Sequence, residues 1–217
     1  MAVLVVGGNS RNIGKTSVVA SLIGNLAEMH WTAFKITQHG HLVCDGKGPY
    51  CDCITSQHTV AFTEETNRTS GRDSARYLYA GAIRSFLIRT RPGSLPEAIP
   101  RLRAECAAAE NAIIESNSVM EFLHPHLYLT VLDPGMGDFK ASAYLFLERA
   151  DAILWRSSKP VRRQSSWPLG VEAVIETKPQ FVLTPPDYSS AELLAFVRER
   201  LVRLARSPAA QPLSASG

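Results

Sequence analysis

Short runs of apolar and β-branched residues alternate along the chain with longer stretches in which apolar residues recur at helical spacing. The short runs have the length of buried strands, and we expect strands at 2–7, 32–36, 82–88, 112–115, 127–132, 152–156 and 181–184. The longer stretches predict helices at 15–29, 72–80, 95–109, 141–149 and 189–205. This alternation predicts an α/β fold in three layers, with a mostly parallel central sheet of about seven strands between helices.

Two segments do not follow this alternation of strand-like and helix-like stretches. Residues 38–70 are polar and rich in His, Cys, Gly and Thr, and we expect a long functional loop there. Residues 157–172 contain lysine, arginines and prolines and are expected to form a basic surface loop. The end of the chain, 207–217, has the composition of a disordered tail. The remainder, 1–206, is expected to fold as a single domain.

The composition is that of a globular protein, because hydrophobic residues make up 45% of the 217 positions. A formal net charge of +3 is too small to indicate nucleic acid as a partner. No apolar stretch approaches the ~20 residues of a membrane span, so no membrane partner is expected. The chain starts directly with a strand-like run and lacks the basic segment and cleavage site of a signal peptide, so we expect a cytoplasmic protein.

The most specific chemical signal is a glycine-rich turn that follows the first predicted strand and opens the first predicted helix. Gly14-Lys15-Thr16 at such a junction is typical of a phosphate-binding loop. Glycine lets backbone N–H groups turn toward phosphate oxygens, lysine supplies a charge for the terminal phosphates, and the threonine hydroxyl is placed to bind Mg²⁺. The residues expected to bind the nucleotide are Gly8, Asn9, Ser10, Arg11, Asn12, Ile13, Gly14, Lys15, Thr16 and Ser17.

The spacing of the glycines in this turn differs from that of the common phosphate-binding loop. Five residues separate Gly8 from Gly14, where the common pattern has four. The resulting Gly-x5-Gly-Lys-Thr resembles the phosphate loop of dethiobiotin synthetase, an ATP-dependent synthetase. Proteins of this class carry the metal-binding acid on a strand separate from the loop. The resemblance therefore implies a P-loop NTPase fold.

Elements farther along the chain look more like molybdopterin-guanine dinucleotide biosynthesis protein B. A strand-end lysine is followed by histidines within 34–41, and two shorter elements follow in the family's order at 70–76 and 80–82. The likeness covers residues 1–135, with Arg72 where the family has lysine. It implies a nucleotide-hydrolysing accessory factor in cofactor biosynthesis that binds ATP or GTP with Mg²⁺. Its partner would be a cofactor precursor or another protein.

Three charged residues at strand ends are candidates for chemistry beside the turn. Glu115 and Asp133 each follow an apolar strand, at the sheet edge where α/β proteins bind ligands. We rank Glu115 first as the catalytic acid and as the Mg²⁺ ligand together with Thr16, and Asp133 second. Lys35 also ends a strand and is expected to act with Lys15 in neutralising charge on a phosphoryl group. Plain surface roles at strand ends are the alternative for Lys35 and Glu115.

The first part of the predicted loop, 38–58, contains a dense set of histidines and cysteines. His41, Cys44, Cys51 and Cys53 would suit Zn²⁺ or an iron–sulfur centre. The Cys-x-Cys spacing differs from the usual Cys-x2-Cys of metal motifs. Unliganded reduced thiols are therefore the alternative.

The sequence leaves three functions open. The first is a Mg²⁺-dependent NTPase that serves as an accessory factor in cofactor biosynthesis. The second is an ATP-dependent kinase or ligase for a small molecule, in which Lys15, Thr16, Lys35 and Glu115 serve phosphoryl transfer. The third is a nucleotide-gated binding module with little turnover that contacts another protein. The guanine-reading Asn/Thr-Lys-x-Asp pattern is absent, but the molybdopterin family also lacks a clear form of it, so the choice between ATP and GTP stays open. A homodimer is compatible with this class.

Overall fold

The computed structural model describes residues 1–38, 59–156 and 167–205. An eight-stranded sheet lies at the centre of this part of the chain, in the order β3-β4-β2-β5-β1-β6-β7-β8. Its neighbouring strands are parallel except for β3 and β4, which are antiparallel. The strands are β1 (Ala2–Gly8), β2 (Trp31–Gln38), β3 (Val60–Glu64), β4 (Arg84–Thr90), β5 (Asn111–Glu115), β6 (Leu127–Leu132), β7 (Ala152–Trp155) and β8 (Gln180–Val182).

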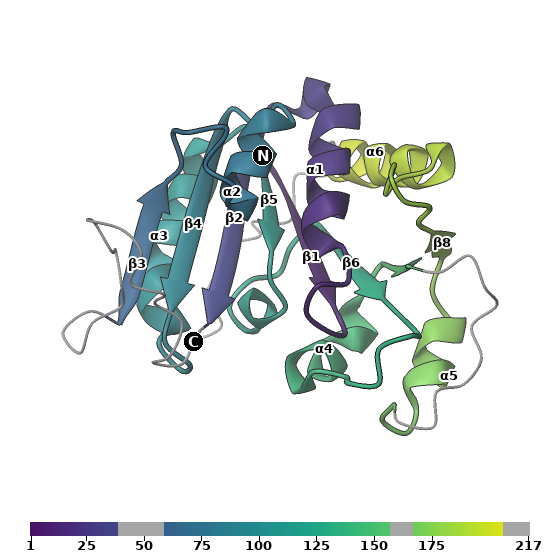
Figure 1. The fold of residues 1–217 in the computed structure, drawn as a ribbon. Helices are drawn as coiled ribbons and strands as arrows, with labels where there is room; N and C mark the ends of the chain where they lie inside the picture. Colours follow the sequence, from purple (N-terminus) through teal and green to yellow (C-terminus); the bar gives the residue numbers. More distant parts are fainter. Residues whose placement is uncertain (39–58, 157–166, 206–217) are drawn as a thin grey trace.

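Helices cover both faces of this sheet (Figure 1). The α-helices are α1 (Lys15–Asn25), α2 (Asp73–Tyr79), α3 (Leu95–Ala108), α4 (Ala141–Leu145), α5 (Val171–Glu176) and α6 (Ala191–Ala205), and the 3-10 helices are η1 (Ala27–Met29), η2 (Ser118–Glu121) and η3 (Leu147–Arg149). Side chains of α1, α2 and α6 form a core cluster with one face of the sheet. Side chains of α3 and α5 form a second cluster with the other face. The predicted three-layer α/β fold with a mostly parallel sheet is therefore confirmed.

The central strand β1 determines where the glycine-rich turn lies. All seven of its residues are buried, as expected for a parallel strand with neighbours on both sides and helices on both faces. Its parallel registers pair Val6 with Glu115 of β5 and Gly8 with Val131 of β6. The turn therefore leaves the sheet at its carboxyl edge, between the ends of β5 and β6.

The sheet has one strand more than predicted, because β3 lies inside the segment 38–70 that was expected to be a loop. This edge strand pairs antiparallel with β4 and is only partly buried. The Phe62 ring packs edge-on against Phe86 at 5.5 Å, and the guanidinium of Arg101 lies 4.3 Å from the centroid of the Phe62 ring. Five residues in a polar stretch give no strong sequence signal, since contacts with β4 and α3 stabilise the strand.

The predicted basic loop 157–172 is also wrong at its end, because α5 begins at Val171. Val171 and Ile175 are buried against the sheet, but a six-residue helix is too short to show clear periodicity. The remaining part of that loop, 157–166, and the predicted tail 207–217 lie outside the described residues. None of the helices in the described ranges is long and apolar enough to span a membrane.

Candidate functional site

The turn between β1 and α1 is tightly curved. Asn12 and Gly14 have backbone φ angles of 57° and 90°, in the left-handed region that favours glycine. A Cβ atom at Gly14 would also come within 2.7 Å of ring carbon Cε1 of Tyr188. The carbonyl of Gly14 accepts the N–H of Val18 at 2.9 Å as α1 begins. Glycine is thus required at this position for its backbone conformation and for the space around it.

The first part of the turn is bound into the fold. The N–H of Gly8 donates to Oδ1 of Asn117 at 2.7 Å, and Nδ2 of Asn117 donates to the Gly8 carbonyl at 2.9 Å. The N–H of Asn9 donates to the carbonyl of Val131 at 3.1 Å, and its buried side-chain Oδ1 accepts the N–H of Asp133 at 3.0 Å. Gly8 and Asn9, both expected to bind phosphate, therefore use their N–H groups to fix the turn.

Ser10 and Ile13 also have their side chains buried. The Ser10 hydroxyl donates to Oδ2 of Asp138 at 2.8 Å, and Ile13 packs in the core cluster beneath α1. The expected nucleotide ligands that do line a cavity are Arg11, Asn12, Gly14, Lys15, Thr16 and Ser17. The second part of the turn thus faces open space, while the first part anchors it.

Asn117 is a positioning residue that the sequence analysis did not single out. The register of β1 and β5 pairs Val6 with Glu115. Gly8 and Asn117 each lie two residues beyond this pair, so the same register brings them side by side. In the sequence, Asn117 could be noticed only as a polar residue two positions after Glu115. Its role becomes clear only when β1 and β5 are known to be neighbouring strands.

Replacing Asn117 with alanine is expected to lower the free energy of unfolding by about 2 kcal/mol, because both backbone groups of Gly8 lose a partly buried partner. Urea denaturation measures this change. Asn25→Ala is the matched control, since Nδ2 of Asn25 donates to the Ser21 carbonyl at an exposed site on α1. Its effect should stay below about 0.5 kcal/mol. Equal small effects in both variants would contradict an anchoring role for Asn117.

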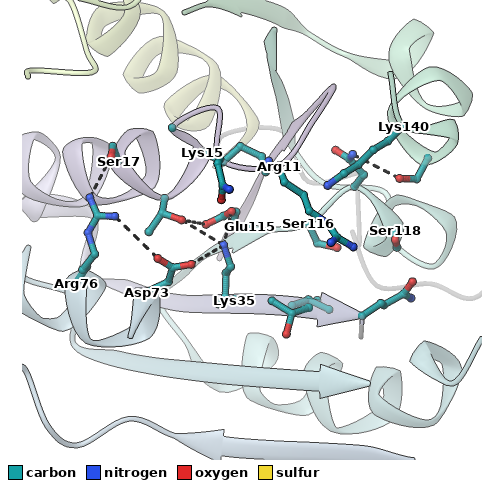
Figure 2. Close-up of a pocket in the computed structure, with 18 of the residues that line it drawn as sticks. Arg11, Lys15, Ser17, Lys35, Asp73, Arg76, Glu115, Ser116, Ser118 and Lys140 are labelled. Atoms are coloured by element: carbon teal, nitrogen blue, oxygen red, sulfur yellow. Dashed lines mark hydrogen bonds and ion pairs between the residues drawn. The ribbon is translucent and has the colours of Figure 1, made fainter. Parts of the chain in front are cut away.

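The second part of the turn opens into a cavity of about 660 Å³ near the carboxyl ends of β2 and β5 (Figure 2). Its lining carries six cationic side chains and two carboxylates, namely Arg11, Lys15, Lys35, Arg76, Lys140, Arg156, Asp73 and Glu115. This excess of positive charge favours a polyanionic ligand. The size of the cavity and its position at the strand ends suit a nucleotide.

Glu115 is the most deeply buried charged side chain of this cavity, at 3% exposure. Its Oε2 accepts hydrogen bonds from the hydroxyl of Thr16 at 2.8 Å and from the phenol of Tyr77, and its Oε1 lies 2.5 Å from Nζ of Lys35. Lys35 and Glu115 are register partners on β2 and β5, which explains why they meet. Burial, reinforced by the neighbouring Glu115 carboxylate, raises the pKa of Tyr77 well above its ordinary value, so the phenol remains a donor.

The oxygen atoms of Thr16 and Glu115 fit a Mg²⁺ ion. A hydroxyl and a carboxylate oxygen 2.8 Å apart beside a phosphate loop are the hard donors that Mg²⁺ takes together with phosphate oxygens. The ammonium of Lys35 lies 3.2 Å from the Thr16 hydroxyl and 2.9 Å from Oδ2 of Asp73. Asp73 thus offers Lys35 a second carboxylate partner when the charge of Glu115 is shared with a divalent cation.

Lys15 folds back over the turn, where its Nζ donates to the carbonyl of Ser10 at 2.5 Å. Burial lowers the pKa of Lys15 to about 8, and the nearby Glu115 opposes this shift only in part. A phosphate group bound at the turn would supply the negative charge that this buried ammonium lacks.

Asp133, the second-ranked acid, does not line this cavity itself, although its partner Arg156 does. Its Oδ2 lies 3.0 Å from Nη1 of Arg156, and its Oδ1 accepts the N–H of Gly135 at 2.8 Å. The side chain does not line the cavity, whereas Glu115 contacts Thr16 directly. The geometry therefore favours Glu115 over Asp133 as the acid beside the turn.

The expected Zn²⁺ or iron–sulfur ligands His41, Cys44, Cys51 and Cys53 lie outside the described residues. Within the part of the chain that the structure describes, no group of three or more His, Cys, Asp or Glu side chains is arranged to hold a metal ion. Cys106 is buried in α3, and this burial raises the pKa of its thiol to about 12. Cys106 therefore contributes to packing as a neutral thiol.

Comparison with known proteins gives likenesses among solved structures. No family model matches this chain, and no curated protein matches it. The chain is similar to HypB from Helicobacter pylori in complex with nickel, at 14% identity over 95% of this chain and 90% of that chain, with a TM-score of 0.49. It is similar to MobB from Bacillus subtilis at 15% identity, over 91% of this chain and 97% of that chain, with a TM-score of 0.40. LpxK from Aquifex aeolicus in complex with ATP matches at 18% identity, over 84% of this chain and 53% of that chain, with a TM-score of 0.43.

With TM-scores below 0.5, these likenesses assign no activity. The fold follows from the chain's own topology, in which a glycine-rich turn joins the central parallel strand β1 to α1 within a three-layer α/β arrangement. This chain has a P-loop NTPase fold.

Proposed function

We propose that this protein binds ATP or GTP with Mg²⁺, hydrolyses it slowly, and acts as an accessory factor in cofactor biosynthesis. The observation that carries the proposal is the contact between Thr16 and Glu115, 2.8 Å apart, in a cationic cavity beside Lys15. A phosphate loop, a hydroxyl and a buried carboxylate in this arrangement are what a Mg²⁺–triphosphate requires. The role in cofactor assembly is supported by the likeness of residues 1–135 to molybdopterin-guanine dinucleotide biosynthesis protein B.

Each side chain has a role that its surroundings support. Lys15 would pair with the terminal phosphates, which relieves the cost of burying its charge. Thr16 and Glu115 would hold Mg²⁺, and Glu115 would also orient the attacking water. Lys35, within reach of Glu115 and Asp73, would balance negative charge as it develops on the phosphoryl group. Mg²⁺, when bound, would neutralise charge on the phosphate oxygens.

A second candidate is phosphoryl transfer to a small acceptor, as in a kinase or ligase of the dethiobiotin synthetase type. The observation in its favour is the extent of the cavity, which continues beyond the turn to Thr37 and Gln38 at the end of β2 and to Ser118 after β5. These residues provide a polar wall for an acceptor molecule. An accessory NTPase has no need of an acceptor, so the two functions differ in what starts the reaction.

A nucleotide panel tests the proposal. ATP, GTP and their diphosphates are added with and without Mg²⁺, and both the melting temperature and phosphate release are measured. We expect a triphosphate to stabilise the protein more strongly with Mg²⁺ than without it, and phosphate release to proceed slowly with no acceptor added. Stabilisation without phosphate release favours the acceptor-dependent function. No stabilisation by either triphosphate would contradict nucleotide binding.

A further inference from the structure

Apart from Lys15 of the turn, two cationic side chains of the cavity form no ion pair with a described residue, whereas its remaining cations do. Lys35 pairs with Glu115 and Asp73, and Arg156 pairs with Asp133. Arg11 and Lys140 line the same cavity but form no ion pair with any residue that the structure describes. The cavity therefore contains more positive charge than its own carboxylates balance.

Lys140 is held next to the turn by its backbone. It follows β6, and its N–H donates to the carbonyl of Asn9 at 2.8 Å, so its position depends on the same segment that carries Arg11. Burial lowers the pKa of Lys140, and the nearby positive charge of Arg11 lowers it further, while Asp138 and Glu115 act in the opposite direction. The two cations are thus close enough to repel each other, and an anion between them would remove this repulsion.

Hydroxyl groups line the same part of the cavity. The Ser142 hydroxyl only accepts a long hydrogen bond of 3.5 Å from Nδ2 of Asn117, so its proton is still available for donation. The Ser118 hydroxyl has no hydrogen-bond partner among the described residues. In Figure 2, Ser118, Arg11 and Lys140 lie on the side of Lys15 and Glu115 that is opposite to Asp73 and Arg76.

We propose that Arg11, Lys140, Ser118 and Ser142 form a second anion site, which binds the phosphate group of a phosphorylated small molecule beside the nucleotide. A phosphate monoester carries close to two negative charges at pH 7, which matches two cations without a counterion. Its three terminal oxygens accept hydrogen bonds from several directions, so hydroxyl groups can donate to the phosphate beside the ammonium and the guanidinium. This inference rests on the proposed function, because the nucleotide is taken to occupy the part of the cavity around Lys15 and Glu115.

The rival explanation is that Lys140 contacts the terminal phosphate of the nucleotide itself. The two explanations differ in what a Lys140 variant loses. A contact with the nucleotide makes the affinity for the triphosphate depend on Lys140. A separate site makes only the second anion depend on it.

Isothermal titration calorimetry separates them, with inorganic phosphate as the probe. The wild-type protein is first saturated with Mg²⁺ and a non-hydrolysable analogue of the triphosphate that gives stabilisation, and phosphate is then titrated. We expect phosphate to bind, and Lys140→Gln and Arg11→Gln each to weaken this binding about tenfold, as expected for the loss of one charge-assisted contact. Lys140→Gln should keep its affinity for the triphosphate analogue within about twofold of wild type. Lys178→Gln, in which a distant lysine that donates to the Glu148 carbonyl is replaced, is the matched control and should bind phosphate as the wild type does.

Three results would overturn the second site. These are the absence of phosphate binding to the saturated wild type, unchanged phosphate affinity in Lys140→Gln, and an equal loss of triphosphate and phosphate affinity in that variant. A titration of phosphate into nucleotide-free Lys15→Ala separates this inference from the proposed function. If Lys15→Ala binds phosphate and the double variant Lys15→Ala/Lys140→Gln binds it about tenfold more weakly, the second site is supported. This holds even if no triphosphate binds to the wild type. Phosphate binding that Lys140→Gln leaves unchanged refutes the second site, whatever the nucleotide panel shows.

Discussion

Lys15→Ala is expected to abolish the stabilisation that a saturating triphosphate gives the wild-type protein. A ligand present at 100 times its Kd adds about 2.7 kcal/mol to the free energy of unfolding, and the variant should lose this gain. The physical reason is that Lys15 brings a nearly buried positive charge to the turn, while the N–H groups of Gly8 and Asn9 are already bound elsewhere. Thermal shift with ATP and with GTP in the presence of Mg²⁺ measures the effect.

The same variant should be no less stable than the wild type without nucleotide. Burial holds the pKa of Lys15 at about 8, below its ordinary value of 10.5, so folding disfavours the charged form at neutral pH. Removing that charge therefore costs no stability by itself. Lys178→Ala serves as the control, because its Nζ donates to the Glu148 carbonyl far from the turn, and it should keep the full nucleotide shift. An undiminished shift in Lys15→Ala would refute the assignment of the turn as the nucleotide site.

Glu115→Gln is expected to reduce phosphate release at least about 100-fold while the turn still binds nucleotide. The amide keeps the shape of the side chain but loses the charge that Mg²⁺ and Lys35 need. Because the carboxylate is buried and Lys35 retains only Asp73 as a carboxylate partner, the free energy of unfolding should also fall by about 3 kcal/mol. Phosphate release and urea denaturation measure the two effects separately.

The control for this variant is Glu105→Gln. Glu105 also pairs with a cation, Arg84, at 2.8 Å, but it belongs to α3 and does not line the cavity, so phosphate release should remain as in the wild type. Asp133→Asn decides between the two acids. A large loss of phosphate release in Asp133→Asn together with normal release in Glu115→Gln would show that Asp133 is the acid used by the site.

Local sequence patterns were sufficient to predict features that are formed by consecutive residues of the chain. The apolar run of β1, the glycines of the turn and the amphipathic start of α1 follow each other directly along the chain, so the strand–turn–helix unit could be predicted from adjacent residues. The position of Glu115 and Lys35 near the turn could also be predicted, because each ends an apolar strand and parallel strands align their carboxyl ends.

Other features depended on which segments become neighbours. The strand β3 exists because β4 offers it hydrogen-bond partners, and its own five residues are too few to predict it within a long polar segment. The helix α5 is short and is recognised by the burial of Val171 and Ile175 against the sheet. The sequence did not identify Tyr77 as a partner of Glu115, since the contact requires α2 to pack against β2 and β4.

The sequence by itself determined that a phosphate-binding turn follows a buried strand, and that an acid and a lysine end the strands nearby. The tertiary structure decided which residues of that turn remain free for a ligand. Asn117 and Val131 accept the N–H groups of Gly8 and Asn9. Of the turn, only residues from Arg11 onward therefore line the cavity. It also brought Lys140 to the cavity that Arg11 lines, although 128 residues separate them along the chain. The reason is physical, because hydrogen-bond partners and unbalanced charges are set by proximity in space, which a linear pattern does not record.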